Sequence, residues 1–165
     1  MSRVYAQLCS FPSPTDPVSR KHASRGFSLL ELLIALAIVI LLASIAVPNL
    51  MKAQRAANEA SAVSSLKLIA GGQLVYRQTQ GEYTTLSYLS QESIVDNLIG
   101  SGTKSGYVFE TSPGAFPAEE YTATATPSVP SGIAASGLHY FFIMQDHVLR
   151  YSMTGPADSS SPPLN

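Results

Sequence analysis

The sequence predicts an α+β fold in which one long N-terminal helix packs on a small antiparallel β-sheet. Three observations predict it. Residues 27–47 are almost wholly apolar, residues 50–74 carry apolar side chains at helical spacing, and the chain beyond residue 81 breaks into short strand-like runs separated by glycine, proline and serine. The length of 165 residues is that of one domain, and a hydrophobic content of 45% excludes disorder over the whole chain.

Charge is scarce and unevenly distributed. Charged residues make up 13% of the chain, against about 25% in typical soluble domains, which indicates a membrane segment or a subunit of an assembly. Residues 1–26 hold four basic residues and one acid, whereas residues 27–165 hold six basic residues and ten acids. The net charge of −1 and the lack of a basic domain argue against a nucleic-acid partner. Cys9 is the only cysteine, which excludes an intrachain disulfide and a multi-cysteine metal site.

The run from Phe27 to Val47 is 21 residues long and contains one ionisable side chain, Glu31. At about 1.5 Å per residue, a helix of this length spans about 31 Å, the thickness of a bilayer core. The lysines and arginines before it predict a single pass with the N-terminus in the cytoplasm. One alternative is a buried helix of a soluble protein, which is rarely apolar on all sides over this length. The other is a secretory signal peptide cut near residues 44–46, although such apolar regions are usually about 7–15 residues long.

Glu31 needs a compensating charge. A carboxylate at the centre of a bilayer costs about 2.5–3.5 kcal/mol. The cost is smaller near the helix start, because a helix N-terminus favours an anion by about 0.3–1 kcal/mol. The side chain either reaches the lipid headgroups or meets a cation within the apolar layer. A free α-amine on Phe27, produced by cutting after Gly26, would be such a cation.

The segment Gly26-Phe27-Ser28-Leu29-Leu30-Glu31 resembles the cleavage motif of type IV pilins and type II secretion pseudopilins. Pro48 also falls where that family has a helix-kinking proline. The resemblance implies that a prepilin peptidase removes residues 1–26 by cutting between Gly26 and Phe27, and that the new N-terminus of Phe27 is methylated. It further implies that Glu31 pairs with the Phe27 amine of a neighbouring subunit during assembly. The chain departs from the pattern at Ile40, where many such pilins carry a helix-melting glycine.

The resemblance also implies partners and a pilin-like fold. The partners are the prepilin peptidase, an inner-membrane assembly platform and further copies of the chain in a helical filament. The leader of 26 residues is long for the family, and a translation start at Val18 would shorten it to nine residues. In either case Cys9 is missing from the mature chain, which therefore cannot form the C-terminal disulfide of many pilins.

After the transmembrane and assembly helix at 27–48, residues 49–81 are predicted to form its amphipathic half. Apolar residues recur at steps of three and four from Leu50 to Leu74, and the polar residues Lys52, Arg55, Asn58, Glu59 and Lys67 mostly occupy other faces. One helix is therefore expected over 28–80. Pro48 would bend it, Gly71-Gly72 would weaken it, and Gly81 would cap its C-terminus.

Residues 82–165 are expected to form a small head. A loop at 81–89, a short helix within 91–99 and a turn at 100–105 are predicted. Strands are predicted at 106–111, 121–126, 138–144 and 148–153, with a hairpin loop at 145–147. Threonine alternates with alanine over 121–126, which predicts one solvated face. Residues 158–165 are expected to be a flexible, exposed tail.

The head carries no catalytic motif. Its only histidines, His139 and His147, are explained by packing and exposure, and Glu119-Glu120 by solvation. No cofactor is expected, and no metal site is assigned. Calcium stays an open alternative because Glu119, Asp146 and Asp158 offer oxygen ligands, although their spacing matches no calcium loop.

The sequence therefore predicts a structural subunit of a type IV pilus-like filament and not an enzyme. The residues leave open a type IV pilin and a type II secretion pseudopilin. The expected location is the bacterial inner membrane, followed by a periplasmic or cell-surface filament. The alternative is a single-pass, membrane-anchored periplasmic binding domain or enzyme that does not polymerise.

Overall fold

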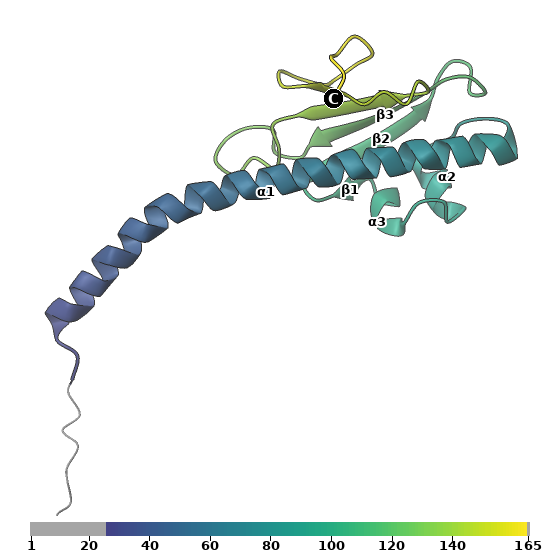
Figure 1. Cartoon of the computed structure of the whole chain (residues 1–165). Helices are drawn as coiled ribbons and strands as arrows, with labels where there is room; N and C mark the ends of the chain where they lie inside the picture. The colour runs from purple at the N-terminus through teal and green to yellow at the C-terminus, as the bar shows by residue number, and fades with distance from the viewer. Residues whose placement is uncertain (1–25, 165) are drawn as a thin grey trace, which may run out of the picture. The chain divides into compact units, whose positions relative to one another are not determined.

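A computed structural model describes residues 26–164 (Figure 1). Cys9 and the basic residues of the leader lie outside the described residues. The chain divides into two compact units, one ending at Val39 and one starting at Ile40. The elements are α1 (Leu29–Gln80), α2 (Leu86–Gln91), α3 (Asn97–Gly100), β1 (Thr103–Lys104), β2 (Tyr107–Pro113), β3 (Tyr121–Pro127), β4 (Tyr140–Met144) and β5 (Arg150–Ser152). The α+β class with a long N-terminal helix and an antiparallel sheet is confirmed.

Helix α1 begins one residue later than predicted and ends at the predicted residue. It continues through Pro48, whose ring nitrogen cannot donate the backbone hydrogen bond that would reach the carbonyl of Ser44. Gly81 ends the helix as predicted. Its φ of 84° lies in the left-handed region, and its N–H donates to the Arg77 carbonyl at 2.8 Å.

The five strands form one antiparallel sheet in sequence order, β1-β2-β3-β4-β5. The longest pairing joins β2 and β3 over seven residues, from Tyr107 opposite Pro127 to Pro113 opposite Tyr121. The four predicted strands are confirmed to within a few residues at each end. Sequential antiparallel pairing needs only short connections, which suits a head of this size.

The core lies between the sheet and the second half of α1. The helix buries one face, made of Ala62, Ser65, Leu66, Ile69, Ala70, Gly72 and Gln73. Ala123 and Ala125 of β3 are fully buried and belong to the same core cluster as these helix residues. The alternating threonines of β3 lie at less buried positions, as the sequence predicted.

Three short elements differ from the predictions. Residues 86–89, expected to be part of a loop at 81–89, belong to α2, because Leu86 and Leu89 are buried against the core. The helix expected within 91–99 is the shorter α3, whose start is capped by Asp96 accepting a hydrogen bond from the Ile99 N–H at 2.6 Å. The predicted turn at 100–105 contains the two-residue strand β1. It pairs back on β2 because Ser105 and Gly106 both adopt positive φ, which suits a tight hairpin.

The C-terminal segment is hydrogen-bonded to the sheet as far as residue 164. The Tyr151 N–H donates to the Pro162 carbonyl at 3.1 Å, and the Leu164 N–H donates to the Leu149 carbonyl at 2.7 Å. Asp158 closes the preceding turn by accepting hydrogen bonds from the serines that follow it. Most residues from 158 to 164 are exposed, as predicted, and the segment covers the edge of β5.

Candidate functional site

The predicted cleavage segment lies just before α1. Residues 26–28 are not helical, and Phe27 is 80% exposed. The carbonyl of Ser28 accepts the first helical hydrogen bond, from the Leu32 N–H at 3.1 Å. Glu31 therefore lies in the first turn of the helix, where the exposed N–H groups favour an anion. Its side chain is exposed and takes part in neither of the ion pairs between described residues.

The helix that follows presents apolar side chains on every side. All residues from Gly26 to Leu50 are exposed. Among residues 26–164, α1 is the one helix that is long and apolar enough to cross a membrane, and none of its most apolar stretch is buried. A core helix of a soluble protein would bury such side chains against its own domain. The exposure therefore favours a membrane or other helices as the surroundings of this segment.

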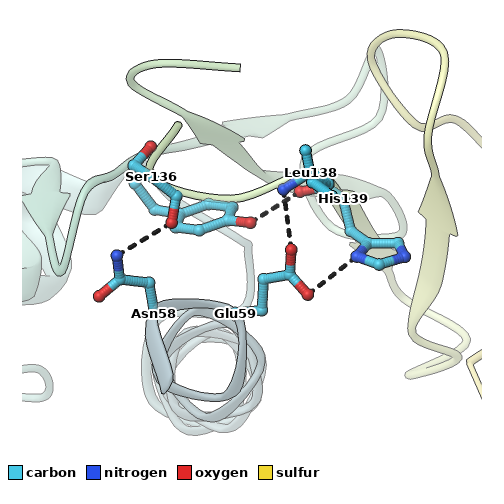
Figure 2. Close-up of polar contacts among 6 residues, drawn as sticks. Asn58, Glu59, Ser136, Leu138 and His139 are labelled. Atoms are coloured by element: carbon cyan, nitrogen blue, oxygen red, sulfur yellow. Dashed lines mark hydrogen bonds and ion pairs between the residues drawn. The ribbon is translucent and has the colours of Figure 1, made fainter. Parts of the chain in front are cut away.

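A polar cluster joins α1 to the loop between β3 and β4, residues 128–139. Figure 2 shows the central part of this cluster. Asn58 donates to the Ser136 carbonyl at 2.9 Å. The carboxylate of Glu59 accepts from the Leu138 N–H and bonds Nδ1 of His139, both at 2.8 Å. The side chains of Glu59 and His139 are both mostly buried. This pair therefore joins residues 80 positions apart in the chain.

Arg55 extends the cluster by one helical turn. Its Nη2 donates to the carbonyls of Gly132 at 2.9 Å and Ile133 at 2.6 Å. On the other side of the cluster, the Tyr107 hydroxyl donates to the His139 carbonyl at 2.9 Å. Burial raises the pKa of Tyr107, which keeps that hydroxyl protonated as a donor. Together these contacts fix residues 132–139 on α1.

This role of Arg55, Asn58 and Glu59 was not predicted from the sequence. The helical periodicity places the polar residues mostly on faces away from the apolar stripe and indicates no partners for them. The signal was present but weak. Polar residues spaced by one helical turn beside a run of alanines can face water or can bind a loop of the head domain. The sequence pattern is the same in both cases, and only the tertiary fold distinguishes them.

Gln73 is a further polar group that the sequence did not single out. It is fully buried in α1. Its amide nitrogen donates to the Thr84 carbonyl and to the Thr111 hydroxyl, and its amide oxygen accepts from the Thr84 N–H. The amide therefore satisfies the backbone of the loop after α1 and also contacts β2.

The carboxylates considered as calcium ligands are engaged separately. Asp146 accepts from Nη2 of Arg150 at 2.6 Å, and this hydrogen bond holds its pKa below the ordinary value. Hydrogen bonds from the hydroxyls of Ser160 and Ser161 likewise lower the pKa of Asp158. Among residues 26–164, no group of three histidine, cysteine, aspartate or glutamate side chains is placed to hold a metal ion.

Comparison with known proteins gives a match to a family model and matches to curated proteins. Residues 21–47 match the family described as the prokaryotic N-terminal methylation motif. The chain is 36% identical over 62 residues to the type IV wide pilus major component PilA4 of Thermus thermophilus, an alignment that covers 38% of this chain and 47% of that protein. It is 32% identical over 88 residues to the type II secretion system core protein G of Escherichia coli, covering 51% of this chain and 61% of that protein. The chain thus spans about half the length of the curated relatives that it matches.

Proposed function

We propose that this chain, which carries the prokaryotic N-terminal methylation motif and is a distant homologue of a type IV pilin and of type II secretion protein G, is a structural subunit of a type IV pilus-like filament. Its relatives belong to a structural family, which argues against an enzyme. Both a pilin and a secretion pseudopilin fit the homology. The proposal divides the chain into a leader at 1–26, an assembly helix at 27–48, an amphipathic half at 49–81 and a head at 82–165.

The first step is cleavage between Gly26 and Phe27 by a prepilin peptidase. Two features support this step. The bond lies in a non-helical segment, and the space around the Cα of Gly26 is open, so a protease can reach an extended backbone there. Cleavage leaves an α-amine on Phe27, which is then methylated. Up to that point the chain crosses the bacterial inner membrane once, with its N-terminus in the cytoplasm.

The second step is assembly, and the position of Glu31 carries the proposal. This carboxylate stands in the first turn of a helix whose apolar side chains are all exposed as far as Leu50. When helices bundle, it would be surrounded by apolar side chains of its neighbours, and an uncompensated charge there is costly. The Phe27 amine of an adjacent subunit compensates it at one stagger between subunits. The ion pair therefore sets the register of the filament, in the way that a single polar residue sets the register of a coiled coil.

The assembly step implies the remaining partners and locations. An inner-membrane assembly platform moves subunits from lipid into a homo-oligomeric helical filament, so apolar area stays out of water throughout. Pro48 lies where the assembly helix meets the amphipathic half, and its missing N–H is a local weak point of the helix. The filament is periplasmic in a secretion system or exposed at the cell surface in a pilus.

The proposal is tested by changing Glu31 alone. We expect Glu31→Ala and Glu31→Gln to be cleaved and held in the membrane like the parent chain, but to yield no filaments. The glutamine variant keeps the size and the hydrogen-bonding capacity of the side chain, so its failure would identify the charge as the requirement. The measurements are the N-terminal residue and mass of the purified chain, and electron microscopy of sheared material labelled for this protein.

Three outcomes would contradict the proposal. A first residue other than phenylalanine would refute the cleavage site. Normal filament yield from both Glu31 variants would refute the charge pairing. A correctly processed parent chain that stays monomeric in the membrane would favour the alternative of a membrane-anchored periplasmic domain that does not polymerise.

A further inference from the structure

The loop between β3 and β4 has an unusual surface for an exposed segment. Residues 128–138 contain no charged side chain. Three of their aliphatic side chains face outwards, with exposures of 44% for Val129, 79% for Ile133 and 45% for Leu138. An uncharged loop that presents a nearly bare isoleucine to water suggests a contact with an apolar partner.

The loop is held next to the end of the apolar run of α1. Arg55 binds the carbonyls of Gly132 and Ile133, and Met51 lines a shallow pocket together with Ile133. Figure 1 shows the loop after β3 beside α1, where Arg55 and Asn58 bind it. The fold therefore fixes the most exposed aliphatic residue of the loop close to the membrane-proximal turns of α1.

The helical rise gives the depth of this position. The apolar run ends at Val47, so Met51 lies about 6 Å and Arg55 about 12 Å farther along the axis at 1.5 Å per residue. The headgroup layer on each side of a bilayer is about 5–8 Å thick, the difference between the full bilayer and its hydrocarbon core. When residues 27–47 fill the core, Ile133 is thus level with the headgroups or just above them.

We propose that the loop at 128–138 is a second membrane contact, in which Ile133 inserts into the headgroup layer of the bilayer that α1 crosses. The inference rests on the membrane insertion that the proposed function includes, but it does not require filament formation. A lipid surface fits better than a second copy of the chain for two reasons. Ile133 lies beside Met51, four residues after the apolar run ends, and the loop carries no charge that would have to leave water.

The contact would limit the orientation of the head before assembly. A single helix lets a head tilt and rotate, whereas a helix and a loop fastened to it by Arg55, Asn58 and Glu59 make two adjacent contacts with one surface. A subunit that leaves the bilayer for a filament must release Ile133 from the headgroups. The loop contact therefore stabilises the subunit with its head held against the bilayer, relative to a subunit whose head has left the membrane surface.

A single environment-sensitive fluorophore tests this proposal in the full-length chain. Cys9→Ser removes the native cysteine, and Ile133→Cys provides the labelling site. The matched control is Phe116→Cys, because Phe116 is 65% exposed and lies in the connection from β2 to β3, at the opposite end of the strands. Each chain is reconstituted in phosphatidylethanolamine–phosphatidylglycerol vesicles with at most one chain per vesicle. Insertion is established first by resistance to alkaline extraction.

We expect the label at residue 133 to show blue-shifted emission, quenching by lipid-borne nitroxides and protection from iodide. The label at 116 should behave as if in water. If the chain inserts and the two labels are equally exposed to iodide, the inference is wrong while the proposed function stands. If protection at 133 arises only when several chains share a vesicle, the partner is a second copy and the lipid contact is refuted. A chain that is extracted by alkali would refute membrane insertion and, with it, both proposals.

Discussion

Two polar side chains of α1 illustrate opposite ways to place a polar group among apolar ones. Gln73 is fully buried, and both ends of its amide are satisfied within the chain by Thr84 and Thr111. Glu31 is exposed on an apolar stretch and takes part in neither ion pair between described residues. The first residue stabilises the folded head, because leaving its partners unpaired would cost about 1–3 kcal/mol. For the second, we propose a partner in another subunit.

The pair Asp146–Arg150 makes the stability of the head depend on pH. The hydrogen bond from Arg150 holds the pKa of Asp146 below its ordinary value of 3.8. A lowered carboxyl pKa stabilises the fold above the ordinary value, and the contribution is lost as the pH falls through the lower, folded value. We therefore expect Asp146→Asn to lower the melting temperature at neutral pH and to have no effect well below pH 3.8.

Thermal unfolding in detergent across the acidic range measures this effect. The asparagine can still accept the hydrogen bond that Asp146 receives from the Val148 N–H, so the variant removes only the charged hydrogen bond with Arg150. Asp158 also has a lowered pKa, but it is present in both chains and its contribution cancels. A difference in melting temperature that persists at the acidic end would contradict this account.

At the scale of single elements, the adjacent glycines of α1 have unequal roles. The sequence analysis treated both as weak points. In the fold Gly72 is buried, and an added Cβ would lie 3.1 Å from Cγ2 of Ile94 and 3.3 Å from Cγ1 of Val95. Around Gly71 an added Cβ would meet nothing within 4 Å. Gly72 is therefore required for close packing, whereas Gly71 only weakens the helix.

The two valine variants should differ accordingly. Gly71→Val gains helix propensity, a few tenths of a kcal/mol, because valine is better than glycine in a helix interior. Gly72→Val gains the same propensity but overpacks the contact with Ile94 and Val95, which costs about 1–3 kcal/mol. Denaturant unfolding of the two full-length variants compares them directly. Equal stabilities would show that the segment at 94–95 yields without cost.

The same scale explains which elements were predictable. Helix α1 and strands β2 to β4 have periodic patterns long enough to be interpreted, β5 follows the hairpin loop predicted at 145–147, and the left-handed conformation available to glycine lets Gly81 mark the helix end. Strand β1 has two residues and α2 has six, which is too short for any period. They exist because Leu86 and Leu89 find a core and because Ser105-Gly106 forms a tight turn. These causes lie in tertiary contacts and in backbone conformation, so the local sequence pattern does not predict α2 or β1.

At the scale of the whole molecule, a site whose residues are close in sequence can be proposed from the sequence, whereas contacts assembled by the fold cannot. Gly26, Phe27 and Glu31 lie within six consecutive residues, so their spacing could be read directly. The cluster of Arg55, Asn58 and Glu59 acts on residues 77 to 80 positions away. No local pattern links such segments. The contact between helix and head therefore had to come from the structure.

This cluster predicts that polar and apolar contacts join different parts of the head to α1. Ala62, Leu66 and Ile69 hold the sheet by burial, whereas the three polar residues hold only the loop at 128–139. We expect the triple variant Arg55→Gln, Asn58→Ala, Glu59→Gln to keep the fold but release the loop. Amide hydrogen exchange of the full-length protein should then accelerate in residues 129–139 and stay slow in β2 and β3. The control is Lys52→Gln with Lys67→Gln, which changes two exposed residues of the same helix. If exchange accelerated throughout the sheet, the polar cluster would be part of the cooperative core. The assignment of separate roles to polar and apolar contacts would then be wrong.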